Sequence, residues 1–126
     1  MRGDEILLQH RAPWVHNGDT WGIPGGARDS HESVIQGAIR EAIEETGIDP
    51  AFLTPLQIHS DEHGNWRYDT VIARATADLV AHEVNDESHE VRWVAIDRVA
   101  DLNLHPSFGN SWPALREILN ELVGSR

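Results

Sequence analysis

The sequence predicts a layered α/β domain, in which a mixed sheet is covered by helices on both faces. Short β-type runs alternate along the chain with two segments of helical periodicity, and strands interleaved with helices favour such layers. The chain has 126 residues, of which 40% are hydrophobic, so it can bury one core but not two. We therefore expect a single domain over residues 1–126.

The predicted strands are short runs of apolar, β-branched or aromatic residues that are bounded by turn-forming residues. They cover residues 6–10, a short segment at Trp21, and residues 56–60, 68–79 and 91–96. The run 68–79 alternates cleanly, which places one face on Val71, Ala73, Ala75, Ala77 and Leu79. A closing amphipathic helix is expected after Asn110, with Ser111 as its cap and Pro113 in its first turn.

The first helix has legible boundaries. Ser33 followed three residues later by Gln36 predicts a capping box that opens the helix at Val34, and Gly47 supplies the left-handed residue that commonly ends one. One side of this helix is apolar and is expected to face the core. It consists of Ile35, Ala38, Ile39, Ala42 and Ile43.

The other side of the same helix carries three carboxylates, Glu41, Glu44 and Glu45, and is expected to face outward. Two like charges about 5 Å apart repel by only ~1 kcal/mol in water, but several-fold more in a cleft. A hard divalent cation removes that penalty, and carboxylate oxygens suit it. The helix therefore predicts a site for Mg²⁺ or Mn²⁺.

The segment from residue 26 to residue 48 resembles the Nudix box, the signature of the Nudix hydrolases, in their MutT-like form. The glycines and charged residues at the spacing of that box are Gly26, Glu32, Arg40, Glu41, Glu44, Glu45 and Gly47. Ala42 and Ile48 occupy its aliphatic positions, and the run 21–25 (WGIPG) is similar to the family's lead-in. The resemblance implies the Nudix α/β/α sandwich with a mixed central sheet.

The resemblance also implies an activity, which is metal-dependent hydrolysis of a nucleoside diphosphate linked to another group. Glu41, Glu44 and Glu45 would hold the metal with the backbone carbonyl of Gly25, and Arg40 would pin the carboxylates. Either Glu41 or Glu44 would serve as the general base. The plainer alternative is a solvated helix face on which Arg40 and Glu44 form an ordinary i,i+4 ion pair.

Three residues outside the box are further candidates from the family's pattern. Glu87 matches a loop position for an additional metal ligand, with Glu90 as its nearest competitor. Arg11 lies where relatives often place a phosphate-binding arginine, whose guanidinium fork suits phosphate oxygens, and an ordinary surface cation is the alternative. Asn110 could read a purine edge, although capping the last helix is the more common use of asparagine there.

The sequence indicates the substrate less clearly than the reaction. A nucleoside triphosphate pyrophosphohydrolase, which could act on oxidised nucleotides, fits the short chain best. The family position whose proline indicates ADP-ribose holds Gly64, and Tyr68 lies slightly beyond the position whose tyrosine indicates dinucleoside polyphosphates. A module that binds a nucleotide metabolite without hydrolysing it stays open as another class, which the intact carboxylate set disfavours.

Composition excludes several partners. The net charge of −11 argues against nucleic-acid polymers and anionic membranes, and the lack of cysteine excludes thiolate chemistry. No apolar run could span a bilayer and no signal peptide opens the sequence, so we expect a cytoplasmic protein.

The sequence starts at a turn formed by residues 2–5, where family members usually carry a full strand first. We therefore expect a missing first sheet strand and an exposed strand edge. Such an edge would either pair with another chain, as in a homodimer, or lower stability.

Overall fold

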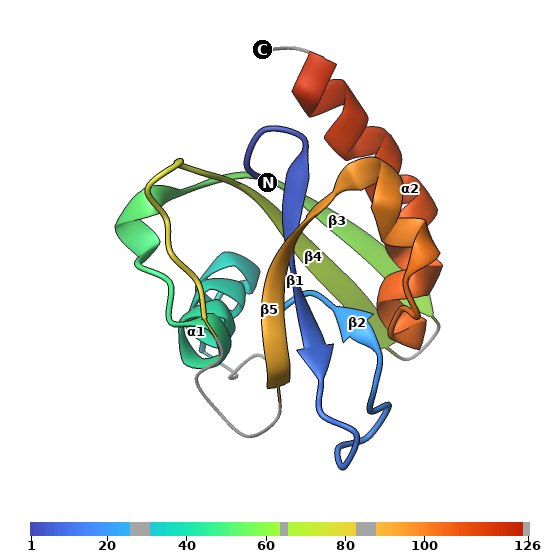
Figure 1. The fold of residues 1–126 in the computed structure, drawn as a ribbon. Helices are drawn as coiled ribbons and strands as arrows, with labels where there is room; N and C mark the ends of the chain where they lie inside the picture. The colour runs from blue at the N-terminus through green and yellow to red at the C-terminus, as the bar shows by residue number, and fades with distance from the viewer. Residues whose placement is uncertain (26–30, 64–65, 83–87, 125–126) are drawn as a thin grey trace.

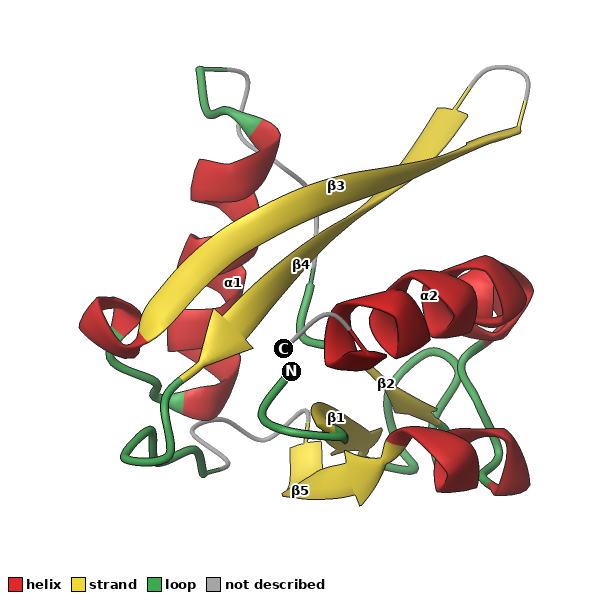
Figure 2. Cartoon of the chain, turned by 90° about the horizontal axis from the view of Figure 1, so that it is seen from above, coloured by secondary structure: helices red, strands yellow, loops and turns green. Residues whose placement is uncertain are grey.

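The computed structural model describes residues 1–25, 31–63, 66–82 and 88–124. Its strands lie between two helices, α1 (Val34–Thr46) and α2 (Pro106–Gly124), which cover opposite sides (Figures 1 and 2). The predicted layered α/β class, in its α+β form, is therefore confirmed. None of the described helices is long and apolar enough to cross a membrane.

The strands form two antiparallel sheets. Their bounds are β1 Glu5–Arg11, β2 Trp21–Gly22, β3 Leu53–His63, β4 Trp66–Ala75 and β5 Ser88–Ala95, with short 3₁₀ helices at Pro50–Phe52 and Ile96–Asp101. One sheet has the order β2-β1-β5, and the other is the β3-β4 hairpin. The expected single mixed sheet is not present among the described residues, because no described strand joins β1 to β4.

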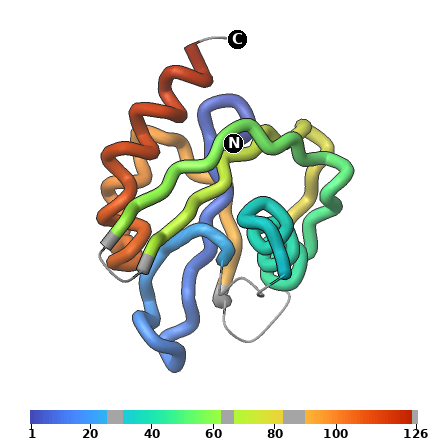
Figure 3. Tube along the Cα trace, turned by 180° about the vertical axis from the view of Figure 1, so that it is seen from behind, coloured from blue at the N-terminus to red at the C-terminus, as the bar shows by residue number. Residues whose placement is uncertain are grey.

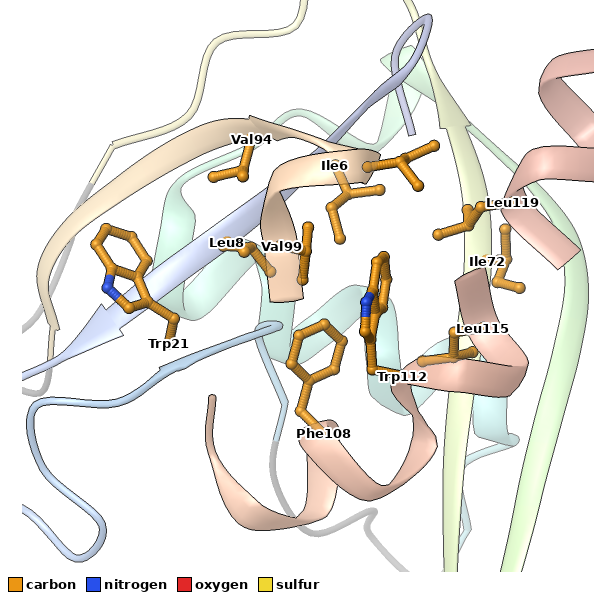
Figure 4. Close-up of a cluster of buried hydrophobic side chains, with 11 residues drawn as sticks. Ile6, Leu8, Trp21, Ile72, Val94, Val99, Phe108, Trp112, Leu115 and Leu119 are labelled. Carbon is orange, nitrogen blue, oxygen red and sulfur yellow. The ribbon is translucent and has the colours of Figure 1, made fainter. Parts of the chain in front are cut away.

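The main core lies between the β2-β1-β5 sheet and α2. Successive side chains of a strand point to opposite faces, so Ile6 and Leu8 of β1 face α2 while Leu7 faces the other side. Figure 4 shows Ile6 and Leu8 gathered with Phe108 and Trp112 of α2. Leu7 instead joins a smaller cluster built on Ile48, Ala75 and Leu79.

Helix α2 begins earlier than predicted. Its first residue is Pro106, so Ser111 lies inside the helix, 1% exposed, and its hydroxyl donates to a carboxylate oxygen of Asp61 in β3. The helical period extends upstream because Phe108 is buried in line with Trp112 and Leu115. The prediction of Ser111 as the helix cap is therefore wrong.

The ends of β4 also differ from the prediction. β4 ends at Ala75 instead of continuing to Leu79, because a turn closed by the Leu79 N–H and the Thr76 carbonyl oxygen (3.2 Å) follows it. Both faces of β4 are covered, since Thr70 and Ile72 are buried although they alternate with the predicted apolar face. A strand between two helices has no solvent face, which is why simple alternation was a poor guide here.

Residue Met1 lies against the edge of β4. Its α-amino nitrogen donates to the Ala73 carbonyl oxygen (2.6 Å), and its own carbonyl oxygen accepts from the Ala75 N–H (2.8 Å). Burial, with smaller contributions from the charges of Arg74 and Arg2, lowers the pKa of this amine from 8.0 to about 6. The folded chain thus favours a neutral amine at this position.

We expect the free energy of unfolding to rise between about pH 6 and pH 8. Below the folded pKa the amine is charged in both states and its burial is penalised, whereas above the unfolded pKa it is neutral in both and the penalty is gone. The rise attributable to Met1 should be about 3 kcal/mol, since one pKa unit corresponds to about 1.4 kcal/mol. Urea unfolding across this range measures it, with Nα-acetylated protein as the control, because acetylation removes the charge but keeps an N–H donor. Equal pH profiles for the two proteins would contradict the assignment.

Candidate metal and nucleotide site

Helix α1 is bounded as its sequence predicts. The Ser33 hydroxyl accepts from the Gln36 N–H (3.1 Å) while the Gln36 side chain accepts from the Ser33 N–H (2.9 Å), which completes the capping box. At the other end Gly47 adopts φ 64°, a left-handed conformation that costs glycine little. These caps fix where the helix starts and stops, and hence where its carboxylates lie along the chain.

The prediction of which side of α1 faces inward is wrong at two positions. Glu45 is only 6% exposed, whereas Ile43 is 38% exposed. The buried residues of α1 are Gly37, Glu45 and Thr46, so the inner face is rotated away from the apolar stripe. Hydrophobicity alone did not reveal this rotation because it depends on polar partners from elsewhere in the chain.

Those partners surround the Glu45 carboxylate. The backbone N–H of Gly25 donates to its Oε2 (2.8 Å), and the side-chain amide of Gln9 in β1 donates to its Oε1 (3.3 Å). A buried charge is tolerated when it is hydrogen-bonded in this way. The interaction fastens the lead-in ending at Gly25 to α1, and places the Gly25 backbone beside the carboxylates.

Arg40 joins the other acidic residues. Its Nε and Nη2 donate to the two carboxylate oxygens of Glu32 (2.8 and 3.0 Å), in a bidentate pair. Its Nη1 donates to Glu41 (3.0 Å) and to Glu44 (3.3 Å). The hydrogen bond with Glu32 is the largest cause of a raised pKa for Arg40, so the guanidinium remains a cation among three carboxylates.

This donor set fits a hard divalent cation by its chemistry. All the side chains offer carboxylate oxygen, and Glu41 and Glu44 already share one positively charged nitrogen. Among the described residues, however, no group of three or more His, Cys, Asp or Glu side chains is placed to hold a metal. Glu41 and Glu44 would therefore have to turn from Arg40 toward Glu45 to form a complete site.

Two cavities are lined by Gly25, the residue whose N–H donates to Glu45. The smaller one, about 310 Å³, is lined by polar and aromatic side chains of Gln9, Arg11, Tyr68, His105 and Phe108. The larger one, about 820 Å³, includes Glu41 in its wall and extends between the two sheets. Concave sites of this size, mostly apolar with a few polar groups, are typical of small-molecule binding.

The side chains of the smaller cavity have defined protonation states. Burial, and secondarily the charge of Asp61, raises the pKa of Tyr68 to about 12, so its hydroxyl stays a neutral donor. Burial, followed by the charges of Arg11 and His16, lowers the pKa of His105. The Ser107 N–H donates to Nδ1 of His105 (3.2 Å), and Nε2 of the same ring lies 3.4 Å from Nδ2 of Asn17.

Not all of the other predicted residues line the cavities. Arg11 lines the smaller cavity, with Nε and Nη2 donating to the His16 carbonyl oxygen (3.1 and 2.9 Å). Asn110 is exposed on α2 and lines neither cavity. Glu90, on β5, pairs with Arg92 (3.0 Å). Glu87 and Gly26 lie outside the described residues.

Sequence reasoning missed Gln9 and His105. Gln9 interrupts an apolar strand and is 2% exposed, and such a buried amide signals a polar partner. The sequence therefore indicated that Gln9 has a buried polar partner, but not which residue that partner is. His105 had no comparable signal, since it reaches the cavity only because the chain before α2 returns to β2, where the His105 N–H donates to the Trp21 carbonyl oxygen (2.8 Å).

The chain is similar to several known proteins. "Putative 8-oxo-dGTP diphosphatase 3" of Mycobacterium tuberculosis is 48% identical over 117 residues, which cover 88% of this chain and 54% of that protein. A "Nucleoside triphosphate pyrophosphatase/Nudix hydrolase fusion protein" of Bifidobacterium longum is 41% identical over 120 residues, which cover 94% of this chain and 25% of that protein. This chain thus spans about half or less of the length of these relatives.

A solved structure agrees with these relatives. The Nudix hydrolase RenU of M. smegmatis superposes with a TM-score of 0.84 at 46% identity, covering 93% of this chain and 76% of that one. The family model of the NUDIX domain matches residues 1–118, which include α1, both cavities' polar residues and most of α2. With its capped acidic helix and the Gly25 lead-in fastened to it, the chain belongs to the Nudix family.

Proposed function

We propose that this domain hydrolyses a nucleoside triphosphate to a nucleoside monophosphate and pyrophosphate, with Mg²⁺ or Mn²⁺ as cofactor. The observation that carries the proposal is the position of two α1 carboxylates: Glu41 lines the larger cavity, and Glu45 accepts from the N–H of Gly25, which lines both cavities. Negative residues beside a nucleotide-sized cavity would repel phosphates unless a cation lay between them. The names of the two relatives support the same reaction class.

In this mechanism Glu41, Glu44 and Glu45 would hold the metal together with the Gly25 carbonyl oxygen. A divalent cation bound there supplies charge neutralisation for phosphate oxygens and lowers the pKa of water. Arg40 acts on the carboxylates themselves, because its bidentate bond to Glu32 fixes the guanidinium from which Glu41 and Glu44 are oriented.

The reaction exchanges one P–O bond for another. Water oxygen bonds to a phosphorus of the polyphosphate, the bridging P–O bond breaks, and pyrophosphate leaves with the electron pair. Glu41 or Glu44 accepts the proton from the attacking water. Glu44 is the more exposed of the two, with 56% of its side chain accessible against 16% for Glu41, so it reaches solvent water more readily.

The smaller cavity would take the nucleoside. Arg11 offers a guanidinium to phosphate oxygens, Phe108 offers an aromatic wall, and Tyr68 offers a neutral hydroxyl donor. His105, kept neutral, avoids adding a second cation where the base would lie. An oxidised guanine nucleotide is the substrate we favour, on the name of the M. tuberculosis relative.

One observation favours a second candidate, a module that binds nucleotides without hydrolysing them. Arg40 already occupies the space between Glu41 and Glu44, and the described residues hold no gathered group of three ligands. If that arrangement persisted with metal present, the chain would bind but not turn over. Product release distinguishes the two candidates.

We expect Glu44→Gln and Glu45→Gln each to lower kcat by about 100-fold or more, because each removes a charge that would hold the metal or activate water. The measurement is release of nucleoside monophosphate and pyrophosphate from a panel of normal and oxidised nucleoside triphosphates, dinucleoside polyphosphates and ADP-ribose with Mg²⁺. Glu117→Gln on exposed α2 is the matched control.

Circular dichroism must show that the variants keep the fold. If both variants hydrolyse nucleotides at the rate of the parent, the assignment of Glu44 and Glu45 to the site is wrong. A parent that binds nucleotide by calorimetry but releases neither product on the panel would replace the hydrolase proposal with the binding-module proposal.

We expect Arg40→Lys to weaken metal binding and lower kcat/KM by about tenfold, because lysine keeps the charge but cannot form the bidentate pair with Glu32. Mn²⁺ titration followed by electron paramagnetic resonance measures the affinity directly. Arg116→Lys, at an exposed position of α2, is the control. Unchanged Mn²⁺ affinity and turnover in Arg40→Lys would show that Arg40 is only a surface ion-pair partner.

A further inference from the structure

Residues 12–20 connect β1 to β2, and we call this segment the β1–β2 loop. Figures 1 and 3 show it, in blue, projecting beyond the ends of both strands. Backbone hydrogen bonds close its base, where the Arg11 N–H donates to the Thr20 carbonyl oxygen (2.9 Å) and the Asp19 N–H donates to the Arg11 carbonyl oxygen (3.0 Å). The loop is therefore closed at Arg11, which lines the smaller cavity.

Three consecutive residues of the loop have special backbone requirements. Asn17 and Asp19 have φ angles of 56° and 58°, in the left-handed region that asparagine and aspartate tolerate better than most residues with a side chain. Between them, a Cβ added to Gly18 would lie 2.6 Å from the carbonyl oxygens of Ala12 and Pro13. These requirements favour one close-packed conformation of the loop.

This conformation directs a carbonyl group at the guanidinium of Arg11. Nε and Nη2 of Arg11 both donate to the His16 carbonyl oxygen, at 3.1 and 2.9 Å. That carbonyl belongs to the peptide group between His16 and Asn17, so the φ angle of Asn17 helps to set its direction. A guanidinium has five N–H donors, of which this contact uses two and leaves three for a ligand or for solvent.

The contact with His16 orients Arg11 without neutralising its charge, because a carbonyl oxygen carries no net charge. Burial first, and then the charge of Arg11, lowers the pKa of His105, which lines the same cavity. In a chain with a formal net charge of −11, a cation held in this way at a cavity wall suits an anionic ligand. Other arginines of the chain pair with carboxylates, and these are Arg40, Arg67, Arg92 and Arg98.

The loop is also connected to the segment that leads into α2. Nδ2 of Asn17 lies 3.4 Å from Nε2 of His105, and Nδ2 of Asn103 donates to the Asp19 carbonyl oxygen (3.4 Å). The loop therefore contacts two residues that line the smaller cavity, Arg11 and His105.

We propose that the β1–β2 loop is a positioning element for Arg11, in which Asn17 and Gly18 hold the His16 carbonyl so that Arg11 presents its remaining N–H donors to a nucleotide phosphate in the smaller cavity. The inference rests on the proposed function for the identity of the ligand. Asn17 and Gly18 are positioning residues, because neither lines the cavity. A guanidinium held in advance loses less side-chain entropy on binding, so the effect belongs to affinity.

Two matched substitutions at Asn17 test the proposal. Asn17→Gly and Asn17→Val both remove the amide, but only valine, which is β-branched, disfavours a φ of 56°. The ligand is 8-oxo-dGMP with Mg²⁺, and calorimetry measures its Kd. We expect a Kd about fivefold higher in Asn17→Val than in Asn17→Gly, because a misdirected guanidinium loses part of a charged hydrogen bond. Equal Kd values in the two variants would overturn the proposal.

Gly18→Ala tests the same conformation independently, because its Cβ would meet backbone atoms. Gly124→Ala is the control, since a Cβ at that position meets nothing within 4 Å. We expect Gly18→Ala to raise the Kd about fivefold and Gly124→Ala to leave it at the parent value. Circular dichroism and thermal unfolding establish that each variant is folded, and the pair at Asn17 decides alone if Gly18→Ala does not fold.

A double-mutant cycle with Arg11→Ala separates positioning from a general loss of loop structure. Arg11→Ala alone should raise the Kd about tenfold or more, because hydrogen bonds between a guanidinium and phosphate are charge-assisted. Adding Asn17→Val to Arg11→Ala should change the Kd by less than about twofold, since no guanidinium is left to position. An effect of Asn17→Val that is as large in this background as in the parent would contradict the proposal.

Binding and turnover are measured separately, so that this inference and the proposed function can fail independently. Asn17→Val should raise KM for the nucleoside triphosphate and leave kcat within about twofold of the parent value. A parent that binds 8-oxo-dGMP with the expected dependence on Arg11 and Asn17, but releases no product, would contradict the proposed function and support this inference. A parent that binds neither 8-oxo-dGMP nor dGMP would overturn it.

Discussion

The candidate site depends on one interaction, the hydrogen bonding of the buried Glu45 carboxylate. Its charge lies inside the protein because the Gly25 N–H and the Gln9 amide hydrogen-bond to it, and removing either donor would leave a charge under-solvated in a poor dielectric. These two bonds connect three segments, the lead-in before α1, strand β1 and α1 itself. They also explain why α1 is rotated so that Ile43 is exposed. The hydrogen bonding of one buried carboxylate thereby helps to decide which residues of α1 are buried.

Arg40 offsets the repulsion among the other carboxylates of the site. Glu32, Glu41 and Glu44 would repel one another, and the Arg40 guanidinium forms an ion pair with each of them. The bidentate pair with Glu32 anchors the cation, so the weaker contacts to Glu41 and Glu44 are the ones that a metal could replace. Under the proposed function, Glu41 and Glu44 are the carboxylates that would turn from Arg40 toward Glu45.

The elements that the sequence located well are those governed by local rules. The capping box at Ser33 and the left-handed Gly47 depend only on nearby backbone groups, and both were predicted correctly. The start of α2 was misplaced because Phe108 is buried by tertiary packing, and the end of β4 because a turn between Thr76 and Leu79 interrupts the alternating run. The hairpin between β3 and β4 was expected, but β3 is longer than its apolar run, since exposed polar residues also pair in the ladder.

The sequence by itself determined the family, the layered class, the limits of α1 and the spacing of its carboxylates, because a helix converts sequence intervals directly into positions on its surface. Only the tertiary structure decided which carboxylate of α1 is buried and which residues line the two cavities. Gln9, Gly25 and Glu45 are far apart along the chain, and no local rule relates them. Their meeting follows from long-range packing and from the need to hydrogen-bond a buried charge.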